Sequence, residues 1–395
     1  MNKPELRFKA ADGSEFPEWE EKKITELFTR IVEKNRADLL PLTIIQGQGT
    51  VRRDESDRRI AYDKKGLKNY KAVKKDDFIV HLRSFEGGLE IANQDGIVSP
   101  AYHVYRGGGN VCPQFYYPYF HSNNFIKGRL AICVTGVRDG KNIEMDTFDE
   151  LILPCPSLPE QKKIATFLLT IDDIITTTQS ELTAWEERKK GVMQKIFNRE
   201  VRFKADDGSE FPAWEEKKIG NLIEIYDEKV NSDCELPILT SSKKYGIQYQ
   251  NDHFGREQLH DISGYNVLPY GYCTYRNRSD GTDFTFNINT LCKRGVVSKF
   301  YPVFISKTTD LYFLVSLLNN EKNIVKKIAY TAKGTGQKVL SISDLQNINV
   351  RIPSLPEQKK IADCLSSLDD VINQIKAELS AWKEFKKGLL QQMFV

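Results

Sequence analysis

Several short polar clusters in this sequence carry side chains that can read the edges of base pairs. Arginine and lysine hydrogen-bond guanine O6 and N7, whereas asparagine and glutamine hydrogen-bond adenine N6 and N7. Two clusters lie at the ends of runs whose composition predicts a β-strand. They are His81-Leu82-Arg83-Ser84 and Tyr275-Arg276-Asn277-Arg278. The alternative for each residue is a phosphate contact or a plain surface position. The candidate nucleic-acid contacts are Arg52, Arg53, Arg83, Ser84, Lys141, Asn142, Lys243, Lys244, Arg276, Asn277, Arg278, Gln337 and Lys338.

A basic run adds an electrostatic argument. Residues 51–75 hold ten Lys or Arg against four Asp or Glu, although the net charge of the 395-residue chain is only +3. A local excess of this kind suits a surface that faces phosphate, and it includes Arg52, Arg53, Arg58 and Arg59. The alternative interpretation of the run is a solvated charged face.

An internal repeat indicates which helices and strands must position these residues. Residues 5–24 and 200–219 match at seventeen of twenty positions, and residues 156–197 and 353–394 match at 24 of 42. The segments between them have diverged, but Tyr70 aligns with Tyr265 and the Gly-Ile-Val-Ser run at 96–99 aligns with Gly-Val-Val-Ser at 295–298. We therefore expect two mixed α/β segments that share one fold and differ in surface.

The second repeated block predicts a long helix. Ser157 and Glu160 have capping-box spacing, and Pro159 falls in the first turn. Apolar residues then recur with the four-three spacing of a coiled coil over about 33 residues, roughly 50 Å. Pseudo-two-fold symmetry would make the two helices pair antiparallel; the alternative is that each packs on its own domain. The expected seam is Ile164, Leu168, Ile171, Ile175, Leu182, Trp185, Ile361, Leu365, Leu368, Ile372, Leu379 and Trp382.

The first repeated block is turn-rich, with Trp19 and Trp214 expected as anchors. Its Glu-Glu-Lys-Lys ending has part of the spacing of a nuclease metal site, at Glu20 and Lys22 and again at Glu215 and Lys217. No upstream carboxylate on a strand completes such a site, so solvated charges in the first turn of a helix are the better interpretation.

Composition excludes several classes of protein. Seven cysteines form no Cys-x-x-Cys pair, so we expect reduced, mostly buried thiols and no metal site. No run approaches the ~18 apolar residues of a membrane span, and the polar N-terminus has no signal-peptide core, so the expected location is the cytoplasm. The sequence also lacks the Asn-Pro-Pro-Tyr/Phe motif of amino-methyltransferases and a phosphate-binding loop.

The chain resembles the specificity subunit of type I restriction–modification systems. The resemblance rests on the duplicated Pro-Ser-Leu-Pro-Glu-Gln-Lys-Lys-Ile-Ala opening a heptad helix, and on the alternation of conserved and variable segments over the whole chain. It implies an α/β protein with two mixed α/β target recognition domains separated by a pair of long antiparallel coiled-coil helices. The implied segments are 1–24 (conserved), 25–155 (first recognition domain), 156–198 (helix), 199–219 (conserved), 220–352 (second recognition domain) and 353–395 (helix).

The resemblance also implies a non-catalytic role. Each recognition domain would bind one half of a bipartite, asymmetric DNA target, and the helices would bind two methylation subunits, through which two restriction subunits join. S-adenosylmethionine, ATP and Mg²⁺ would be bound by those partners and not by this chain. Two alternatives remain open from the residues alone: a coiled-coil scaffold with two protein-binding heads, and a nuclease or methylase in its own right.

Overall fold

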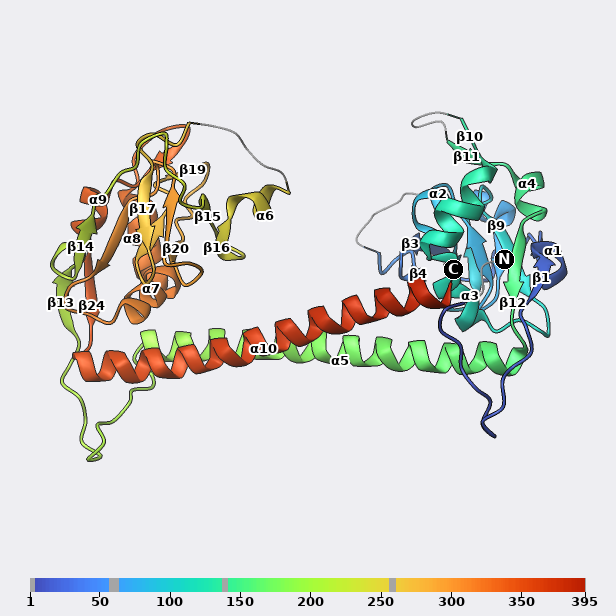
Figure 1. The fold of residues 1–395 in the computed structure, drawn as a ribbon, viewed down its shortest axis with the longest axis horizontal. Coiled ribbons are helices and arrows are strands. Elements are labelled where there is room, and N and C mark those ends of the chain that lie inside the picture. The colour runs from blue at the N-terminus through green and yellow to red at the C-terminus, as the bar shows by residue number, and fades with distance from the viewer. Residues whose placement is uncertain (1–3, 57–63, 137–140, 256–260, 395) are drawn as a thin grey trace. The chain divides into compact units, whose positions relative to one another are not determined.

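The computed structural model describes residues 4–56, 64–136, 141–255 and 261–394. The chain forms two compact units: unit 1 comprises residues 1–180 and 376–395, and unit 2 comprises residues 181–375. Each unit is a mixed α/β domain that includes part of each of the two longest helices, α5 (Leu158–Phe197) and α10 (Leu355–Met393) (Figure 1). The expected mixture of helix and strand, with two long helices, is confirmed.

Unit 1 is built around a four-stranded antiparallel sheet with the order β2-β9-β6-β7. The unit also contains the two-stranded pairs β1-β12, β3-β4, β5-β8 and β10-β11. Its strands are β1 Glu20–Lys23, β2 Phe28–Ile31, β3 Leu42–Ile45, β4 Gly49–Arg52, β5 Lys71–Val73, β6 Phe78–Val80, β7 Glu90–Ile91, β8 Gly96–Val98, β9 His103–Gly107, β10 Val134–Thr135, β11 Asn142–Ile143 and β12 Ile152–Cys155. Its short helices are α1 Ile24–Leu27, α2 Ser84–Gly87, α3 Pro113–Phe120 and α4 Met145–Asp149.

Unit 2 repeats this plan with the sheet order β14-β22-β18-β20 and the pairs β13-β24, β15-β16, β17-β21 and β19-β23. Its strands are β13 Glu215–Lys218, β14 Ile223–Tyr226, β15 Leu239–Ser242, β16 Gly246–Tyr249, β17 Asn266–Pro269, β18 Cys273–Tyr275, β19 Arg278–Ser279, β20 Phe286–Ile288, β21 Arg294–Val297, β22 Val303–Ser306, β23 Lys338–Val339 and β24 Asn349–Ile352. Its short helices are α6 Gln250–Phe254, α7 Leu311–Asn320, α8 Lys322–Thr331 and α9 Ile342–Gln346.

The two sheets agree in register as well as in strand order. Ile79 of β6 lies opposite Val104 of β9, and Thr274 of β18 lies opposite Val303 of β22. Parallel bridges outside the sheets also correspond, from Pro41 to Ile97 and from Ile238 to Val296. The two diverged segments therefore share one fold, as the faint alignment of their sequences predicts.

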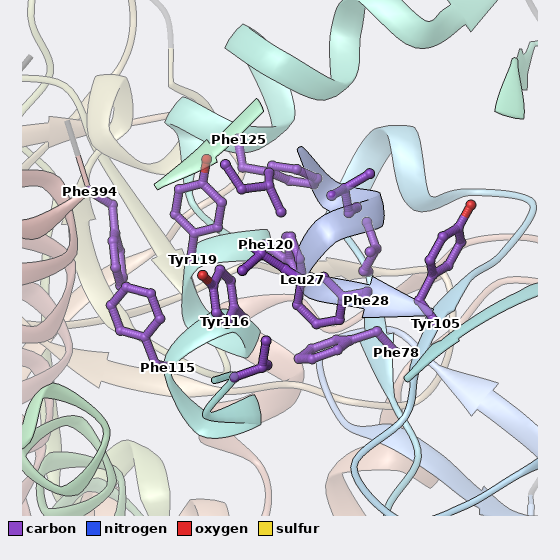
Figure 2. Close-up of a cluster of buried hydrophobic side chains, with 14 of the residues drawn as sticks. Leu27, Phe28, Phe78, Tyr105, Phe115, Tyr116, Tyr119, Phe120, Phe125 and Phe394 are labelled. Carbon is purple, nitrogen blue, oxygen red and sulfur yellow. The ribbon is translucent and has the colours of Figure 1, made fainter. Parts of the chain in front are cut away.

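Aromatic side chains dominate the core of unit 1, as Figure 2 shows. Phe28 meets Phe78 edge-on at 5.5 Å, and Phe394, at the end of the last helix, meets both Phe115 and Tyr119 at 5.5 Å. Trp19 meets the same Phe115 edge-to-face, with ring centroids 5.9 Å apart. The conserved block and the end of α10 are thus anchored to one helix, α3, of the domain.

Unit 2 uses the same attachment. Trp214 meets Phe313 of α7 edge-to-face with ring centroids 6.0 Å apart, and Phe197 at the end of α5 meets the same ring at 6.4 Å. Edge-to-face pairs of this kind add to the stabilisation from burial. The expectation that Trp19 and Trp214 act as anchors is confirmed.

The predicted capping box at the start of α5 is wrong. The Ser157 hydroxyl is buried without a hydrogen-bond partner among the described residues, and Glu160 binds Arg7. The start of α10 has the same departure, with Ser354 buried in the same state and Glu357 bound to Arg202. In each copy, the glutamate that the local spacing assigned to the helix cap instead forms an ion pair with an arginine far away in the sequence.

The Glu-Glu-Lys-Lys segments are also not first turns of helices. They form β1 and β13, which pair antiparallel with β12 and β24. Glu20 lies opposite Cys155 and Glu215 opposite Ile352, so each strand joins the conserved block to the strand that leads into a long helix. Their charged side chains are mostly exposed, as the interpretation of solvated charges requires.

The conserved blocks are attached to the ends of the long helices by equivalent backbone bonds. In unit 1 the Glu5 amide donates to the Gln392 carbonyl at 2.9 Å. In unit 2 the Glu200 amide donates to the Lys195 carbonyl at 2.9 Å. Glu5 and Glu200 are equivalent in the repeat, as are Gln392 and Lys195, so a peptide connection in one copy is replaced by a contact between distant segments in the other.

The long helices exceed the predicted length. They contain 40 and 39 residues, which is about 60 Å at ~1.5 Å per residue. All seven cysteines are free, and four of them are buried. Within the described ranges, no group of three or more His, Cys, Asp or Glu is placed to hold a metal ion, and no helix has the length and apolarity to cross a membrane.

Candidate nucleic-acid interface

Each unit has a β-hairpin whose turn is hydrogen-bonded to a side chain of the central sheet. In unit 1 the Glu90 carboxylate of β7 accepts the amides of Gly47 and Gly49 at 2.7 and 2.9 Å, at the turn of the β3-β4 hairpin. In unit 2 the Asn287 amide of β20 donates to Ser241 Oγ at 2.7 Å and to the Ser242 carbonyl at 3.1 Å, at the turn of β15-β16. The hairpin is therefore a fixed part of each domain.

Glu90 is a buried carboxylate with several donors. Burial by itself raises the pKa of Glu90, but hydrogen bonds from His121, Gly47 and Gly49 outweigh burial and hold that pKa below its ordinary value of 4.5. Gly49 is also fixed by its backbone, because its φ is +77° and a Cβ atom there would lie 2.6 Å from the Ile91 carbonyl oxygen. The turn of this hairpin therefore requires both the carboxylate and the glycine.

The basic run of unit 1 is only partly a free surface. Arg52, at the end of β4, forms ion pairs with Asp54 at 2.7 Å and Glu55 at 3.4 Å. Arg53 lies over the Tyr70 ring, 5.6 Å from its centroid, and donates to the Tyr70 hydroxyl at 3.1 Å. Arg58 and Arg59 lie outside the described residues.

The other candidates of unit 1 divide into exposed and buried positions. Arg83 is exposed, as are Lys141, just before β11, and Asn142, the first residue of β11. The Lys141 ammonium lies 5.7 Å from the centroid of the Phe85 ring. Ser84 is completely buried, and its hydroxyl accepts the His81 amide at 2.9 Å. The prediction for Ser84 is wrong in this fold, because a side chain that closes the turn after β6 cannot reach a ligand at the surface.

Four of the seven candidates in unit 2 come together through the β19-β23 pair. Arg278 lies opposite Val339 in this pair, and the backbone carbonyl of Asn277 accepts the Leu340 amide at 2.9 Å. The pair thus brings the cluster after β18 beside the loop that holds Gln337 and Lys338. Sequence inspection proposed these two loops separately, and the fold places them side by side.

Contacts within unit 2 shape the donors of this surface. The Arg278 guanidinium stacks on the Phe300 ring at 4.0 Å, and Gln337 Nε2 donates to Asp280 Oδ1 at 3.0 Å. Arg276 is exposed, whereas the Asn277 side-chain oxygen is buried and has no hydrogen-bond partner in the described part of the chain. On the hairpin, Lys243 pairs with Asp283 at 2.9 Å and Lys244 lies 4.8 Å from the Tyr245 ring.

The helix seam is buried in each unit. In unit 1, the first half of α5 runs antiparallel to the second half of α10 (Figure 1), and one core cluster holds Ile164, Leu168 and Ile171 together with Leu389 and Met393, with Ile175 and Trp382 packed against it. In unit 2, a second cluster contains Ile196, Ile361 and Leu365, with Val192 and Leu368 against it. Leu182, Ile372 and Leu379 are buried, whereas Trp185 is half-buried beneath Arg188.

Charged residues within the seam form a pair of equivalent contacts. In unit 1, Lys386 of α10 binds Asp172 of α5. In unit 2, Lys189 of α5 binds Asp369 of α10, and the Tyr312 hydroxyl donates to the same carboxylate. The repeat carries a signal for these ion pairs, because Asp172-Asp173 and Lys189-Lys190-Gly191 recur at 369–370 and 386–388, and each copy supplies one partner to each pair.

Sequence inspection missed the residue that follows the β15-β16 hairpin of unit 2. Gln250 comes directly after β16, as Arg53 comes after β4, and both donate their backbone amide to the residue before the first hairpin strand. Only a comparison of the two copies position by position identifies Gln250, because the hairpin sequences themselves share little beyond a Leu-Thr pair and a glycine.

Comparison with known proteins identifies the family. The model of the type I restriction modification DNA specificity domain matches residues 17–184 and again residues 213–381. The putative type I restriction enzyme MjaX specificity subunit of Methanocaldococcus jannaschii is 24% identical and aligns with 98% of this chain and 95% of its own length. The MjaVIII specificity subunit of the same organism is 27% identical over 63% of this chain and 62% of that protein.

Solved structures show the same fold. The type I restriction–modification S subunit from M. genitalium superimposes with a TM-score of 0.58 at 14% identity and covers 100% of this chain and 99% of its own. A chain from a study of complex assembly and conformational transition of the type I R-M system gives a TM-score of 0.53 at 14% identity, with 96% and 98% covered. With two matches that span most of its length, the chain belongs to the family of type I restriction–modification specificity subunits, which recognise a DNA target through two domains.

Proposed function

We propose that this chain recognises a bipartite, asymmetric DNA target, with one half-site for each unit and an unread spacer between the half-sites. One observation carries the proposal: the two units have the same strand order and register, but different side chains at matched surface positions. Because the two folds match, the base-contacting side chains of both units are held in the same way. Different donors and acceptors on that frame select different bases, so the full target is not a palindrome.

The chain itself is non-catalytic, as are the specificity subunits of this family. We therefore assign methyl transfer and ATP-dependent cleavage to partner subunits, and with them the binding of S-adenosylmethionine, ATP and Mg²⁺. Two methylation subunits would bind here, and two restriction subunits would join through them.

Exposed identities between the two copies support the binding of one kind of partner twice. Asp12, Ser14 and Glu15 are exposed in unit 1, and their equivalents Asp207, Ser209 and Glu210 are identical and exposed in unit 2. Within the chain these side chains bind neighbours in the same turn, Ser14 to Asp12 and Lys9 to Glu15, and the turn itself stays exposed. A partner that contacts the same surface in both units would use them.

Exchange of one recognition segment tests the proposal. Residues 25–155 are replaced by the matching segment of a related specificity subunit, and the methylome is determined in cells that also make the methylation subunits. One half-site should change, whereas the other half-site and the spacer length should stay the same. A change in both halves, or a single continuous palindrome for the unaltered chain, would contradict the proposal.

The alternative of a scaffold with protein-binding heads is tested separately with purified chain. A DNA-binding subunit should shift a duplex in a gel, with an affinity that falls steeply as salt rises because phosphate contacts release counterions. Absence of any salt-dependent shift, both for the purified chain and for its complex with the methylation subunits, would favour the scaffold.

A further inference from the structure

Four matched positions surround the same point of the frame in both units. They are the residue after the second hairpin strand, the residue after the central sheet strand, and two tyrosines on neighbouring strand ends. In unit 1 they are Arg53, His81, Tyr70 and Tyr102, and in unit 2 they are Gln250, Arg276, Tyr265 and Tyr301.

Backbone contacts establish this match independently of the side chains. The Arg53 amide donates to Pro41 at 3.1 Å, and the Gln250 amide donates to Ile238 at 2.9 Å. The turn before the second tyrosine also corresponds, because the Tyr102 amide donates to Ser99 at 3.1 Å and the Tyr301 amide donates to Ser298 at 2.9 Å. His81 and Arg276 match through the sheet register, since each directly follows the strand that pairs with β9 or β22.

In unit 2 these side chains line a cavity of about 390 Å³. Gln250 contributes a buried side-chain oxygen that has no hydrogen-bond partner among the described residues, and the exposed Arg276 lines the same cavity. Tyr265, Phe300 and Tyr301 form part of its wall. A buried oxygen without a partner costs free energy unless a ligand satisfies it.

In unit 1 the matched residues also include a buried polar atom without a hydrogen-bond partner among the described residues, Nε2 of His81. Arg53 lies over Tyr70, and the His81 ring lies 6.3 Å from that of Tyr102. His81 Nδ1 accepts the Arg83 amide at 3.3 Å, so the ring proton is on Nε2, and that atom is buried with no partner among the described residues. Burial lowers the pKa of His81, so the ring is neutral at pH 7, with Nε2–H as its donor.

The contrast between the copies indicates what these positions do. Both tyrosines are retained, as is the backbone geometry that presents them. The two other positions differ completely, Arg53 against Gln250 and His81 against Arg276. Stability of a shared frame gives no reason for such an exchange of hydrogen-bonding groups, whereas readers of two different half-sites must differ there.

We propose that Gln250 and Arg276 read bases for unit 2, and that Arg53 and His81 read bases for unit 1. The proposal rests on the proposed function and names the residues that give it specificity. Glutamine presents one acceptor and one donor that match adenine N6 and N7, and arginine presents two donors that match guanine O6 and N7. The half-site of unit 2 therefore contains an adenine read by Gln250 and a guanine read by Arg276.

Exchange of the proposed reading side chains tests this assignment. Glutamate accepts a hydrogen bond from cytosine N4, so Gln250→Glu should change the adenine of one half-site to cytosine. Arg276→Gln should change a guanine to adenine at a second position of the same half-site. Both are measured as methylomes in cells with the methylation subunits. The matched control is Gln374→Glu on the exposed face of α10, which should leave the motif unchanged.

A second measurement covers variants that methylate too weakly for a methylome. The assembled complex of Gln250→Ala is given duplexes in which each base of the half-site is varied in turn. A mismatched base pair ordinarily reduces binding about 5- to 150-fold. At the position that Gln250 reads, that discrimination should fall to about one, whereas it should persist at every other position.

The outcomes separate this proposal from the function on which it rests. If the unaltered chain directs methylation to a bipartite motif, but Gln250→Glu and Arg276→Gln keep that motif and Gln250→Ala keeps full discrimination, the assignment of readers is overturned alone. A change in both half-sites would overturn it as well. If the unaltered chain gives no bipartite motif, the proposed function itself fails.

Discussion

The guanidinium of Arg7 and the carboxylate of Glu160 form a two-point ion pair, with Nε to Oε1 at 3.0 Å and Nη2 to Oε2 at 2.9 Å. The Glu160 side chain has no exposed surface, whereas that of Arg7 is 20% exposed. Arg202 and Glu357 repeat the contact in unit 2, with the glutamate 1% exposed. Each conserved block is therefore attached to the first turn of a long helix by a buried charge.

Removal of the arginine should cost much more than a surface ion pair contributes. Arg7→Ala leaves the Glu160 carboxylate buried without its counter-charge, and such a loss costs about 3–5 kcal/mol. We expect the urea concentration at the midpoint of unfolding of unit 1 to fall clearly. Hydrogen exchange of the core amides of unit 1 is the measurement that monitors this unfolding. The matched control is Lys9→Ala, which removes an exposed pair with Glu15 and should cost less than about 1 kcal/mol. Equal effects of the two variants would contradict the assignment.

The ion pair between Lys189 and Asp369 should stabilise the helix seam of unit 2. Their side chains are 18% and 34% exposed, and Tyr312 donates to the same carboxylate. Because hydrogen bonds to charged groups contribute about 1.5–3 kcal/mol, Asp369→Asn should lower the free energy of unfolding by about that amount. Glu187→Gln breaks the exposed pair with Lys190 and is the control, with an expected change below about 0.5 kcal/mol. Urea unfolding of both variants measures the difference, and a silent Asp369→Asn would refute the role.

Acid should loosen the hairpin of unit 1 before that of unit 2. The pKa of Glu90 is held below 4.5, so the stability that its carboxylate gives is fully present above about pH 4.5 and is lost as pH falls through the lowered folded pKa. Protection of the Gly47 and Gly49 amides, corrected for intrinsic exchange, should fall in that range. Asn287 does not titrate, so the β15-β16 hairpin is an internal control. Glu90→Gln should remove the pH dependence; identical acid profiles for the two hairpins would count against it.

The basic side chains of the β19-β23 pair should determine part of the salt dependence of DNA binding. If Arg278 and Lys338 contact phosphate, each alanine substitution should reduce the slope of log affinity against log salt by about 0.9. The loss of affinity should be the same on cognate and unrelated duplexes. Lys190→Ala, on an exposed position of α5, should leave the slope unchanged. Unchanged slopes for Arg278→Ala and Lys338→Ala would show that this surface does not contact phosphate.

The sequence predicts the long helices and the repeat well, because both depend on local spacing. Ile164, Leu168 and Ile171 recur at the period of a buried helical seam, and they are buried. The same local logic fails at Glu160, whose spacing from Ser157 matches a capping box. Its actual partner, Arg7, lies 153 residues away, and no local rule identifies it.

The candidate interface shows the same division. The polar clusters after β6 and β18 were found from composition, but Ser84 was included with them although it closes a buried turn. Glu20 and its neighbours form a strand only because β12 supplies a partner from a segment more than 100 residues later. Gln250 was missed because its significance depends on register, which only the folded sheets establish.

The equivalence of the Glu5–Gln392 and Glu200–Lys195 contacts makes the order of the two copies exchangeable. A chain opened between residues 198 and 199, with Phe394 joined to Glu5 by a two-residue link, would retain every contact described in either unit. In topological terms the protein is a cycle of two repeats. Peptide bonds join the repeats at residues 198–200, and at the equivalent junction Glu5 and Gln392 are joined by a hydrogen bond instead. A circular permutant with its ends at that opening should therefore fold and recognise the same DNA.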